Sequence, residues 1–311
     1  MSPAAATSPF PIYYLGDSHV RYFRRAAQHG LLAHGELTGL EVGGATAVGM
    51  RNPNAKTNAI GRYREWISDK PRDAIVVIHL GEVDCGFVIW YRAAKYDERV
   101  QAQARQSVEA YFEFVDELIA AGFRRIVITG ATLPTISDDD LVGEVVQKRS
   151  SITATQRERT DLTMQYNRAL ASEAQRRNLP FVDIASDIID PVAGVVKARL
   201  RNRNPEDHHM DLDIAGVHWA RHLRPVLAEY HGLTPEPRGW QCVRDSYAKA
   251  LPVHSRLLSS DMLQAIKIGD QIEADLVGEF GEYLLVENLA VNGSDFPLLS
   301  LLHKAHLKDA V

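Results

Sequence analysis

Short apolar segments alternate with longer segments of helical periodicity along the first 230 residues of the chain. The short segments hold consecutive β-branched residues, as in Ile75-Val76-Val77-Ile78, which is typical of strands buried on both faces. The predicted strands are 12–15, 40–42, 75–80, 126–129 and 181–184. The predicted helices are 20–29, 56–68, 94–121, 156–177 and 214–230. This order predicts an α/β protein whose parallel sheet has helices on both sides.

The segments outside this pattern set the domain boundaries. Residues 1–9 lack the basic and apolar regions of a signal peptide and are predicted to be a disordered tail. The main domain is predicted over 10–232. Prolines at 235 and 237 suggest a linker, and a small β-containing module is predicted over 240–311. The predicted strands of this module are 265–268, 272–277 and 283–286.

Composition excludes some classes of partner. The 311 residues are 45% apolar and 24% charged, which is ordinary for a soluble globular protein. A formal charge of -5 argues against a nucleic-acid partner, and no apolar run is long enough to span a membrane. Cys85 and Cys242 make no disulfide framework, so a cytoplasmic location is expected. No cofactor is predicted, and the oligomeric state stays open.

The first predicted strand leads directly into a polar turn, Leu15-Gly16-Asp17-Ser18-His19. Ser18 is expected at the carboxyl end of a strand, where open α/β sheets place their ligands. It is also expected at a helix N-terminus, whose free N–H groups favour negative charge. Both features suit a nucleophile that builds an oxyanion beside itself. The alternative is that Asp17 or Ser18 is simply a helix N-cap.

Two more polar segments follow the second and third predicted strands. Gly44, in Gly43-Gly44-Ala45, allows close backbone approach and can offer an N–H to an oxyanion, although a flexible turn is equally compatible. The segment Glu82-Val83-Asp84-Cys85 brings two carboxylates and a thiol together. Its alternative interpretation is a helix cap with solvated acids.

A histidine-containing segment, Glu206-Asp207-His208-His209-Met210, precedes the last predicted helix. A histidine with nearby acids is what a serine base needs, because the acid fixes the tautomer and stabilises the imidazolium. Surface histidines or a metal pair are the alternatives. Consecutive histidines are expected to point in different directions, so no metal site is predicted.

Taken together, the four segments resemble the SGNH hydrolases, or GDSL-type esterases, over residues 10–230. The resemblance implies a flavodoxin-like three-layer fold with a mostly five-stranded parallel sheet. It implies that Ser18 is the nucleophile, that the N–H groups of Ser18 and Gly44 bind the oxyanion, and that His209 is the base. It also implies an acyl-enzyme intermediate.

Two positions depart from the family pattern. Val83 stands where the family has an asparagine that is the third oxyanion donor, and losing such a donor commonly costs about 10²–10³ in rate. The Gly-Glu-Val-Asp-Cys string resembles a variant within the superfamily. Asp17, Glu82 and Asp84 are therefore kept as candidate oxyanion- or substrate-binding residues.

The second departure concerns the acid of the triad. The family has an aspartate three residues before the histidine, and Glu206 occupies that position here. Asp207, two residues before, is preferred if the loop is tight, with Glu206 as the alternative. His208 is a competing base, whereas His218 falls inside the last predicted helix and is assigned a structural role.

The predicted function is ester hydrolysis or deacylation, acting on an acylated sugar or small metabolite, or on a glycoconjugate acyl ester. An acyltransferase and a non-catalytic binding protein on the same scaffold are the alternatives. Specificity is expected from loops at 34–58, 87–96 and 132–155. Two groups have either a binding or a structural role: the aromatic cluster Phe87, Trp90, Tyr91 and Tyr96, and the basic residues Arg21, Arg24 and Arg25.

Overall fold

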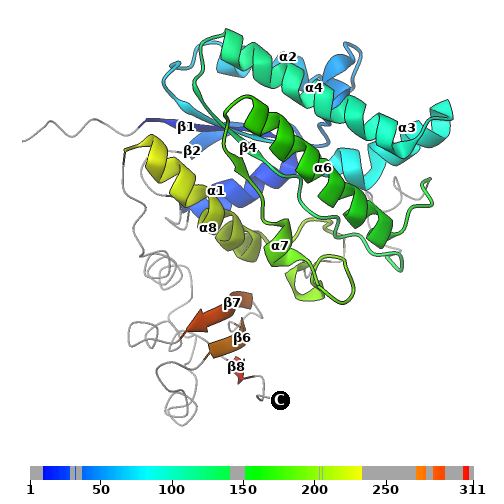
Figure 1. The fold of residues 1–311 in the computed structure, drawn as a ribbon, viewed down its shortest axis with the longest axis vertical. Helices are drawn as coiled ribbons and strands as arrows, with labels where there is room; N and C mark the ends of the chain where they lie inside the picture. Colours follow the sequence, from blue (N-terminus) through cyan, green and yellow to red (C-terminus); the bar gives the residue numbers. More distant parts are fainter. Residues whose placement is uncertain are drawn as a thin grey trace, which may run out of the picture.

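The computed structural model describes residues 10–28, 32, 37–140, 151–202, 204 and 206–232, and three strands in the C-terminal region. Five parallel strands form the main sheet, in the order β2-β1-β3-β4-β5 (Figure 1). They are β1 (Ile12–Gly16), β2 (Leu37–Glu41), β3 (Ile75–His79), β4 (Arg125–Thr129) and β5 (Phe181–Val182). This is the strand order of the flavodoxin-like fold, so the predicted fold class is confirmed.

Helices cover both faces of this sheet (Figure 1). The α-helices are α1 (Arg21–Gln28), α2 (Ala59–Ile67), α3 (Ile89–Tyr96), α4 (Val100–Ala120), α6 (Gln156–Arg176), α7 (Ala185–Ile188) and α8 (Leu212–Tyr230). Shorter helical segments are η1 (Ser18–Val20), η2 (Val48–Arg51), the π-helical η3 (Asp84–Val88) and η4 (Ala198–Leu200). Helices α1 and α8 pack on one face, and α2, α4 and α6 pack on the other.

The sheet separates two hydrophobic cores because successive strand residues point to opposite faces. Val76 and Ile78 of β3 belong to the core that includes residues of α2, α4 and α6. Ile75 and Val77 belong to the core that includes residues of α1 and α8. All four side chains are almost completely buried, which explains why β3 is a continuous apolar run.

The prediction of one helix over 94–121 is wrong. Asp97 adopts a left-handed conformation with φ 53°, so α3 ends at Tyr96 and α4 begins at Val100. The loop predicted over 87–96 is also wrong, because this segment belongs to η3 and α3. Helix α3 is stabilised by its buried residues Ile89 and Ala93, and such packing overrides weak local signals.

Three antiparallel strands are described within the C-terminal region, in the order β7-β6-β8. They are β6 (Gln271–Val277), β7 (Tyr283–Ala290) and β8 (Lys304–Leu307). Strands β6 and β7 cover the predicted strands 272–277 and 283–286. The predicted tail, the linker and the strand over 265–268 lie outside the described residues, and the module over 240–311 stays a prediction. Among the described helices, none has the length and hydropathy needed to cross a lipid bilayer.

Candidate active site

The chain turns sharply where β1 ends beside β3. The backbone N–H of Asp17 donates to the carbonyl oxygen of His79 at 3.2 Å. A Cβ atom at Gly16 would lie 2.1 Å from the same oxygen, so only glycine allows this approach. The turn therefore places Ser18 at the carboxyl edge of the sheet, where ligands bind in open α/β folds.

Ser18 is the first residue of η1, and its neighbour Asp17 caps this short helix. The Asp17 side chain accepts the backbone N–H of His19 at 2.9 Å. Of the two residues considered as a helix N-cap, Asp17 has this role and Ser18 does not. Because Asp17 meets that requirement of the helix, the Ser18 hydroxyl is available for another contact. The Ser18 residue is 8% exposed.

The structure brings Ser18 and His209 into hydrogen-bond contact although 191 positions separate them. The Ser18 Oγ lies 2.8 Å from Nε2 of His209. The Nδ1 atom of the same ring lies 2.6 Å from Oδ1 of Asp207, which also accepts the His209 backbone N–H at 3.0 Å. With Nδ1 protonated and donating to the carboxylate, Nε2 is left to accept the serine proton.

The surroundings keep this histidine neutral and this carboxylate charged. Burial lowers the pKa of His209 and the neighbouring His19 lowers it further, against the opposing effect of Asp207. Burial acts to raise the pKa of Asp207. The hydrogen bonds from the backbone and ring of His209 nevertheless hold that pKa below its ordinary value. A neutral imidazole beside an ionised carboxylate is the resting state that a general base requires.

Two supporting residues were missed by the sequence analysis. The side-chain amide of Asn202 donates to Oδ2 of Asp207 at 3.0 Å. The hydroxyl oxygen of Tyr22, on α1, accepts the backbone N–H of Met210 at 2.9 Å and so ties the loop before α8 to α1. Neither residue belongs to a sequence motif, because each acts through a contact that only folding creates.

Glu206, the alternative acid, is exposed, and its backbone N–H donates to the side chain of Asn204 at 3.1 Å. The ring of His209 contacts Asp207 instead. His218, assigned a structural role, lies on α8 with Nδ1 3.7 Å from the carboxylate of Asp187.

Gly44 lies in an exposed turn directly after β2, with φ +72° and open space beside its Cα. Asp84 holds the next part of the same loop. Its carboxylate accepts the backbone N–H groups of Ala47 at 2.8 Å and Val48 at 3.1 Å, and the Ser107 hydroxyl at 2.7 Å. Burial raises the pKa of Asp84 to about 6 despite these bonds. Asp84 therefore organises the loop that follows Gly44.

Glu82 is buried beside His19. The sequence analysis did not assign a role to His19. Nε2 of His19 lies 3.8 Å from Oε2 of Glu82, and its Nδ1 lies 2.9 Å from Oδ1 of Asp17. Val83 follows with helical φ and ψ angles at the start of η3. Its hydrocarbon side chain donates no hydrogen bond.

Two of the basic residues of α1, Arg21 and Arg24, contact β2. Arg21 Nη2 lies 2.6 Å from a carboxylate oxygen of Glu41, and Arg24 lies 3.7 Å from the other oxygen. Arg21 and Arg24 therefore belong to a surface ion-pair network with Glu41.

The aromatic cluster divides into packed and exposed members. Phe87 stacks on Tyr91 with ring centroids 5.7 Å apart, and the Trp90 indole donates to the carbonyl of Cys85 at 2.8 Å. Tyr91 and Tyr96 are 41% and 49% exposed. Only these two tyrosines therefore offer substantial aromatic surface to a ligand.

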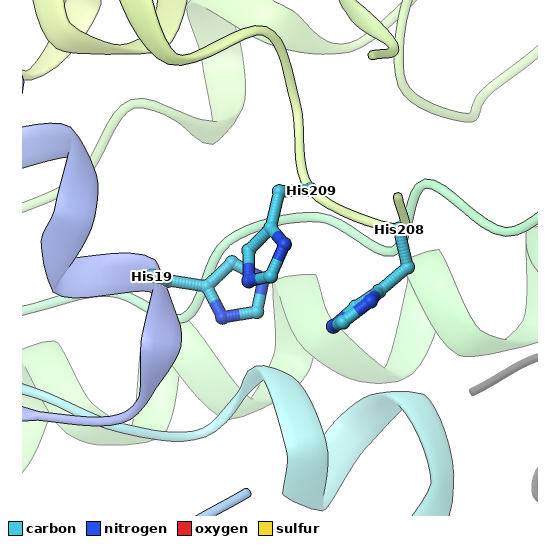
Figure 2. A group of neighbouring side chains, drawn as sticks. All are labelled: His19, His208 and His209. Atoms are coloured by element: carbon cyan, nitrogen blue, oxygen red, sulfur yellow. The ribbon is translucent and has the colours of Figure 1, made fainter. Parts of the chain in front are cut away.

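The rings of His19, His208 and His209 lie close together (Figure 2). The ring centroid of His209 lies 4.7 Å from that of His19 and 4.2 Å from that of His208. The rings of the consecutive residues His208 and His209 thus lie beside each other. This differs from the expectation that they point apart, because the loop before α8 is not a regular element in which neighbours alternate.

No protein-family model matches the sequence, and no curated protein matches it. Several solved structures are similar to the chain. A GDSL-like lipase from Bacteroides thetaiotaomicron is 13% identical, with a TM-score of 0.45, and the match covers 73% of this chain and 91% of the lipase. A carbohydrate acetylesterase family member from Sinorhizobium meliloti is 14% identical, with a TM-score of 0.49, and the match covers 72% of this chain and all of the esterase (100%).

Proposed function

We propose that this chain is a serine-dependent ester hydrolase of the SGNH type. One observation carries the proposal: Ser18, His209 and Asp207 form a continuous series of contacts of 2.8 Å and 2.6 Å. A hydroxyl, a neutral imidazole and an ionised carboxylate in this order are the parts of a nucleophile, its base and the group that orients the base.

The reaction follows from the proton positions. His209 Nε2 takes the proton of the Ser18 hydroxyl while Oγ forms a bond to the ester carbonyl carbon. The carbon–oxygen bond to the alcohol then breaks, and the leaving alcohol takes the proton from His209. In the second half of the reaction, His209 takes a proton from water while the water oxygen forms a bond to the acyl carbon. The bond from that carbon to Ser18 Oγ then breaks, Oγ takes the proton from His209, and the acid is released. Asp207 stabilises the imidazolium in both halves without itself being protonated.

The proposed donors to the oxyanion are the backbone N–H groups of Ser18 and Gly44. Residue 18 begins η1 after β1, and Gly44 follows the neighbouring strand β2, so both lie at the same edge of the sheet. Val83 supplies no side-chain donor. Because one missing donor commonly costs about 10²–10³ in rate, we expect modest turnover.

The proposed substrate is an acyl ester of a sugar or another small polar molecule. The exposed rings of Tyr91 and Tyr96 support this proposal, since exposed aromatic faces stack on sugar rings and on planar acyl groups. Lys95 Nζ lies 5.7 Å and 5.4 Å from the two ring centroids and lends this surface positive charge.

The direct test measures acyl-enzyme formation with a short-chain p-nitrophenyl ester and covalent labelling with a fluorophosphonate, read by mass spectrometry. We expect a burst followed by turnover, and one label per chain on Ser18. Ser18→Ala should lose both signals. Ser68→Ala is the matched control, because Ser68 is an exposed serine that donates to the Glu65 carbonyl at the end of α2.

Labelling or turnover that persists in Ser18→Ala contradicts the proposal. An unlabelled wild-type chain favours the non-catalytic binding protein. A burst that decays faster when an alcohol or amine acceptor is added favours the acyltransferase.

A further inference from the structure

The geometry points to a site for a divalent transition-metal ion, of the zinc class, formed by His19, His208 and His209. One ring nitrogen can be chosen on each histidine so that the three atoms all lie within 4.8 Å of one another. Figure 2 shows the three side chains converging from η1 and from the loop before α8. His19 and His209 are buried, and His208 is half-buried.

Two of the three rings are already oriented as metal ligands. Nδ1 of His19 contacts Asp17 at 2.9 Å, and Nδ1 of His209 contacts Asp207 at 2.6 Å. Histidines that bind metals almost always donate their other ring N–H to such a carboxylate or carbonyl, which fixes the ring and raises its basicity. In both residues Nε2 is therefore the atom offered to an ion.

The charge around the cluster favours a cation. Asp17 and Asp207 lie behind the two rings, and Glu82 Oε2 lies 3.8 Å from Nε2 of His19. The second carboxylate oxygen of Asp17, Oδ2, is buried and has no hydrogen-bond partner among the described residues. Carboxylates this close to the three rings favour the binding of a divalent cation.

The donor set selects the kind of ion. Imidazole nitrogens suit zinc, copper and nickel, whereas magnesium and calcium require oxygen ligands. Tetrahedral zinc with bonds of about 2.0–2.1 Å places its ligand nitrogens about 3.3 Å apart. The rings must therefore close together by about 1.5 Å at most, and a water molecule or the Ser18 hydroxyl can take the fourth position.

Metal binding and ester hydrolysis exclude each other at this site. The Nε2 lone pair of His209 accepts the Ser18 proton in the proposed reaction, and the same lone pair would bind the ion. An occupied site therefore has no base, and zinc acts as a reversible inhibitor. Inhibition rests on the proposed function, whereas binding itself does not.

The binding test uses full-length protein stripped of metal with a chelator. Zinc is titrated by calorimetry, and cobalt(II) is added separately because its visible absorption reports tetrahedral nitrogen coordination. Ser18→Ala is measured in parallel, so that binding is observed without catalysis. We expect one ion per chain in both proteins and a tetrahedral cobalt spectrum.

His208→Gln and His208→Asn remove one ligand and should weaken zinc binding about 10-fold or more. His231→Gln is the matched control. This histidine stacks on Phe10 and accepts its backbone N–H at 3.3 Å, outside the cluster. Zinc inhibition of ester cleavage, measured for each variant against its own zinc-free rate, should weaken by the same factor as binding.

Equal zinc affinity in the wild type and both His208 variants overturns the inference, because the ion then lies elsewhere, for example at Asp187 and His222. Absence of stoichiometric binding to the wild type also overturns it. Zinc binding without ester cleavage leaves the inference standing and removes the proposed function. Ester cleavage that zinc does not inhibit leaves the proposed function standing and overturns the inference of a metal site that includes His209.

Discussion

Two aspartate–histidine pairs lie in the same part of the chain, with Asp207 and His209 between Asp187 and His222 in sequence, and they differ in what surrounds them. Asp207 contacts His209 at 2.6 Å, and Asp187 contacts His222 at 2.7 Å. The other nitrogen of His209 meets the hydroxyl of Ser18. The carboxylate of Asp187 is shared with further basic groups, His218 at 3.7 Å and Arg221 at 3.6 Å.

A short carboxylate–histidine contact is therefore compatible with two different roles. The groups around Asp187 lower its pKa despite burial, so it stays ionised and ties α7 to α8. At Asp207 the carboxylate instead orients a ring whose other nitrogen, Nε2, contacts the hydroxyl of Ser18. The group at the far nitrogen decides whether the pair stabilises the fold or can activate a nucleophile.

Neutralising each carboxylate in turn tests directly whether the two pairs have different roles. Asp207→Asn should lower kcat/KM for an activated ester by about 10⁴, because the amide favours the wrong tautomer of His209. Asp187→Asn should leave kcat/KM within about threefold. It should instead lower the free energy of unfolding by about 1.5–3 kcal/mol, the usual value of a hydrogen bond to a charged group.

Steady-state kinetics and denaturant unfolding of both variants measure these two effects. Similar losses of kcat/KM in the two variants would mean that the two pairs do not differ in function.

Another buried histidine, His79, extends the comparison because hydroxyl groups contact both of its ring nitrogens. Nδ1 lies 2.7 Å from Thr129 Oγ1, and Nε2 lies 3.3 Å from Thr132 Oγ1. The Thr129 hydroxyl donates to the Ile78 carbonyl, so it accepts from Nδ1. Both contacts suit a neutral ring, and burial lowers the pKa of His79 to about 4.

A folded-state pKa below the unfolded value means that stability is complete above pH 6.5 and is lost as the pH falls towards 4. Between these pH values the unfolded chain protonates this histidine while the folded chain does not, which should remove about 3 kcal/mol of unfolding free energy. Urea unfolding of the wild type and His79→Gln at pH 7 and pH 4.5 measures the difference. An equal pH dependence in the two proteins would show that His79 does not contribute.

We expect a smaller effect on activity from removing the side chain that hydrogen-bonds to Asp207. Asn202→Ala removes the amide that donates to Oδ2 of Asp207 at 3.0 Å. Loss of one such bond, worth about 1.4 kcal/mol, should lower kcat about tenfold. The matched control is Glu206→Gln, at the exposed neighbouring acid, which should change kcat less than about twofold. A larger loss in Glu206→Gln than in Asn202→Ala would favour Glu206 as the orienting acid.

We expect the smallest change in the pH dependence of kcat/KM. Because burial and the neighbouring His19 lower the pKa of His209, the acidic limb of kcat/KM should lie below pH 6.5. Glu82 raises the pKa of His209, so Glu82→Gln should move the limb further down. The profile is recorded with a chelator present. A limb above pH 6.5 in the wild type, or an upward shift in Glu82→Gln, contradicts this account of the site.

Periodicity in the sequence was sufficient to predict the sheet and most of the helices. The run Ile75-Val76-Val77-Ile78 predicts a strand with both faces covered, and its residues do divide between the two cores. The break at Asp97 was not predictable, because its left-handed conformation occurs without the glycine or proline that usually marks an interruption. Packing of α3 decides that boundary.

The site divides in the same way. The sequence alone determined that Ser18 follows a strand and that a histidine with two acids precedes the last helix, because local patterns encode local structure. Long-range packing decides that Asp207 rather than Glu206 contacts His209, and that His19 and His208 lie beside it. These contacts join η1 to a loop almost two hundred residues away, and distances of that kind depend on how the sheet and helices pack.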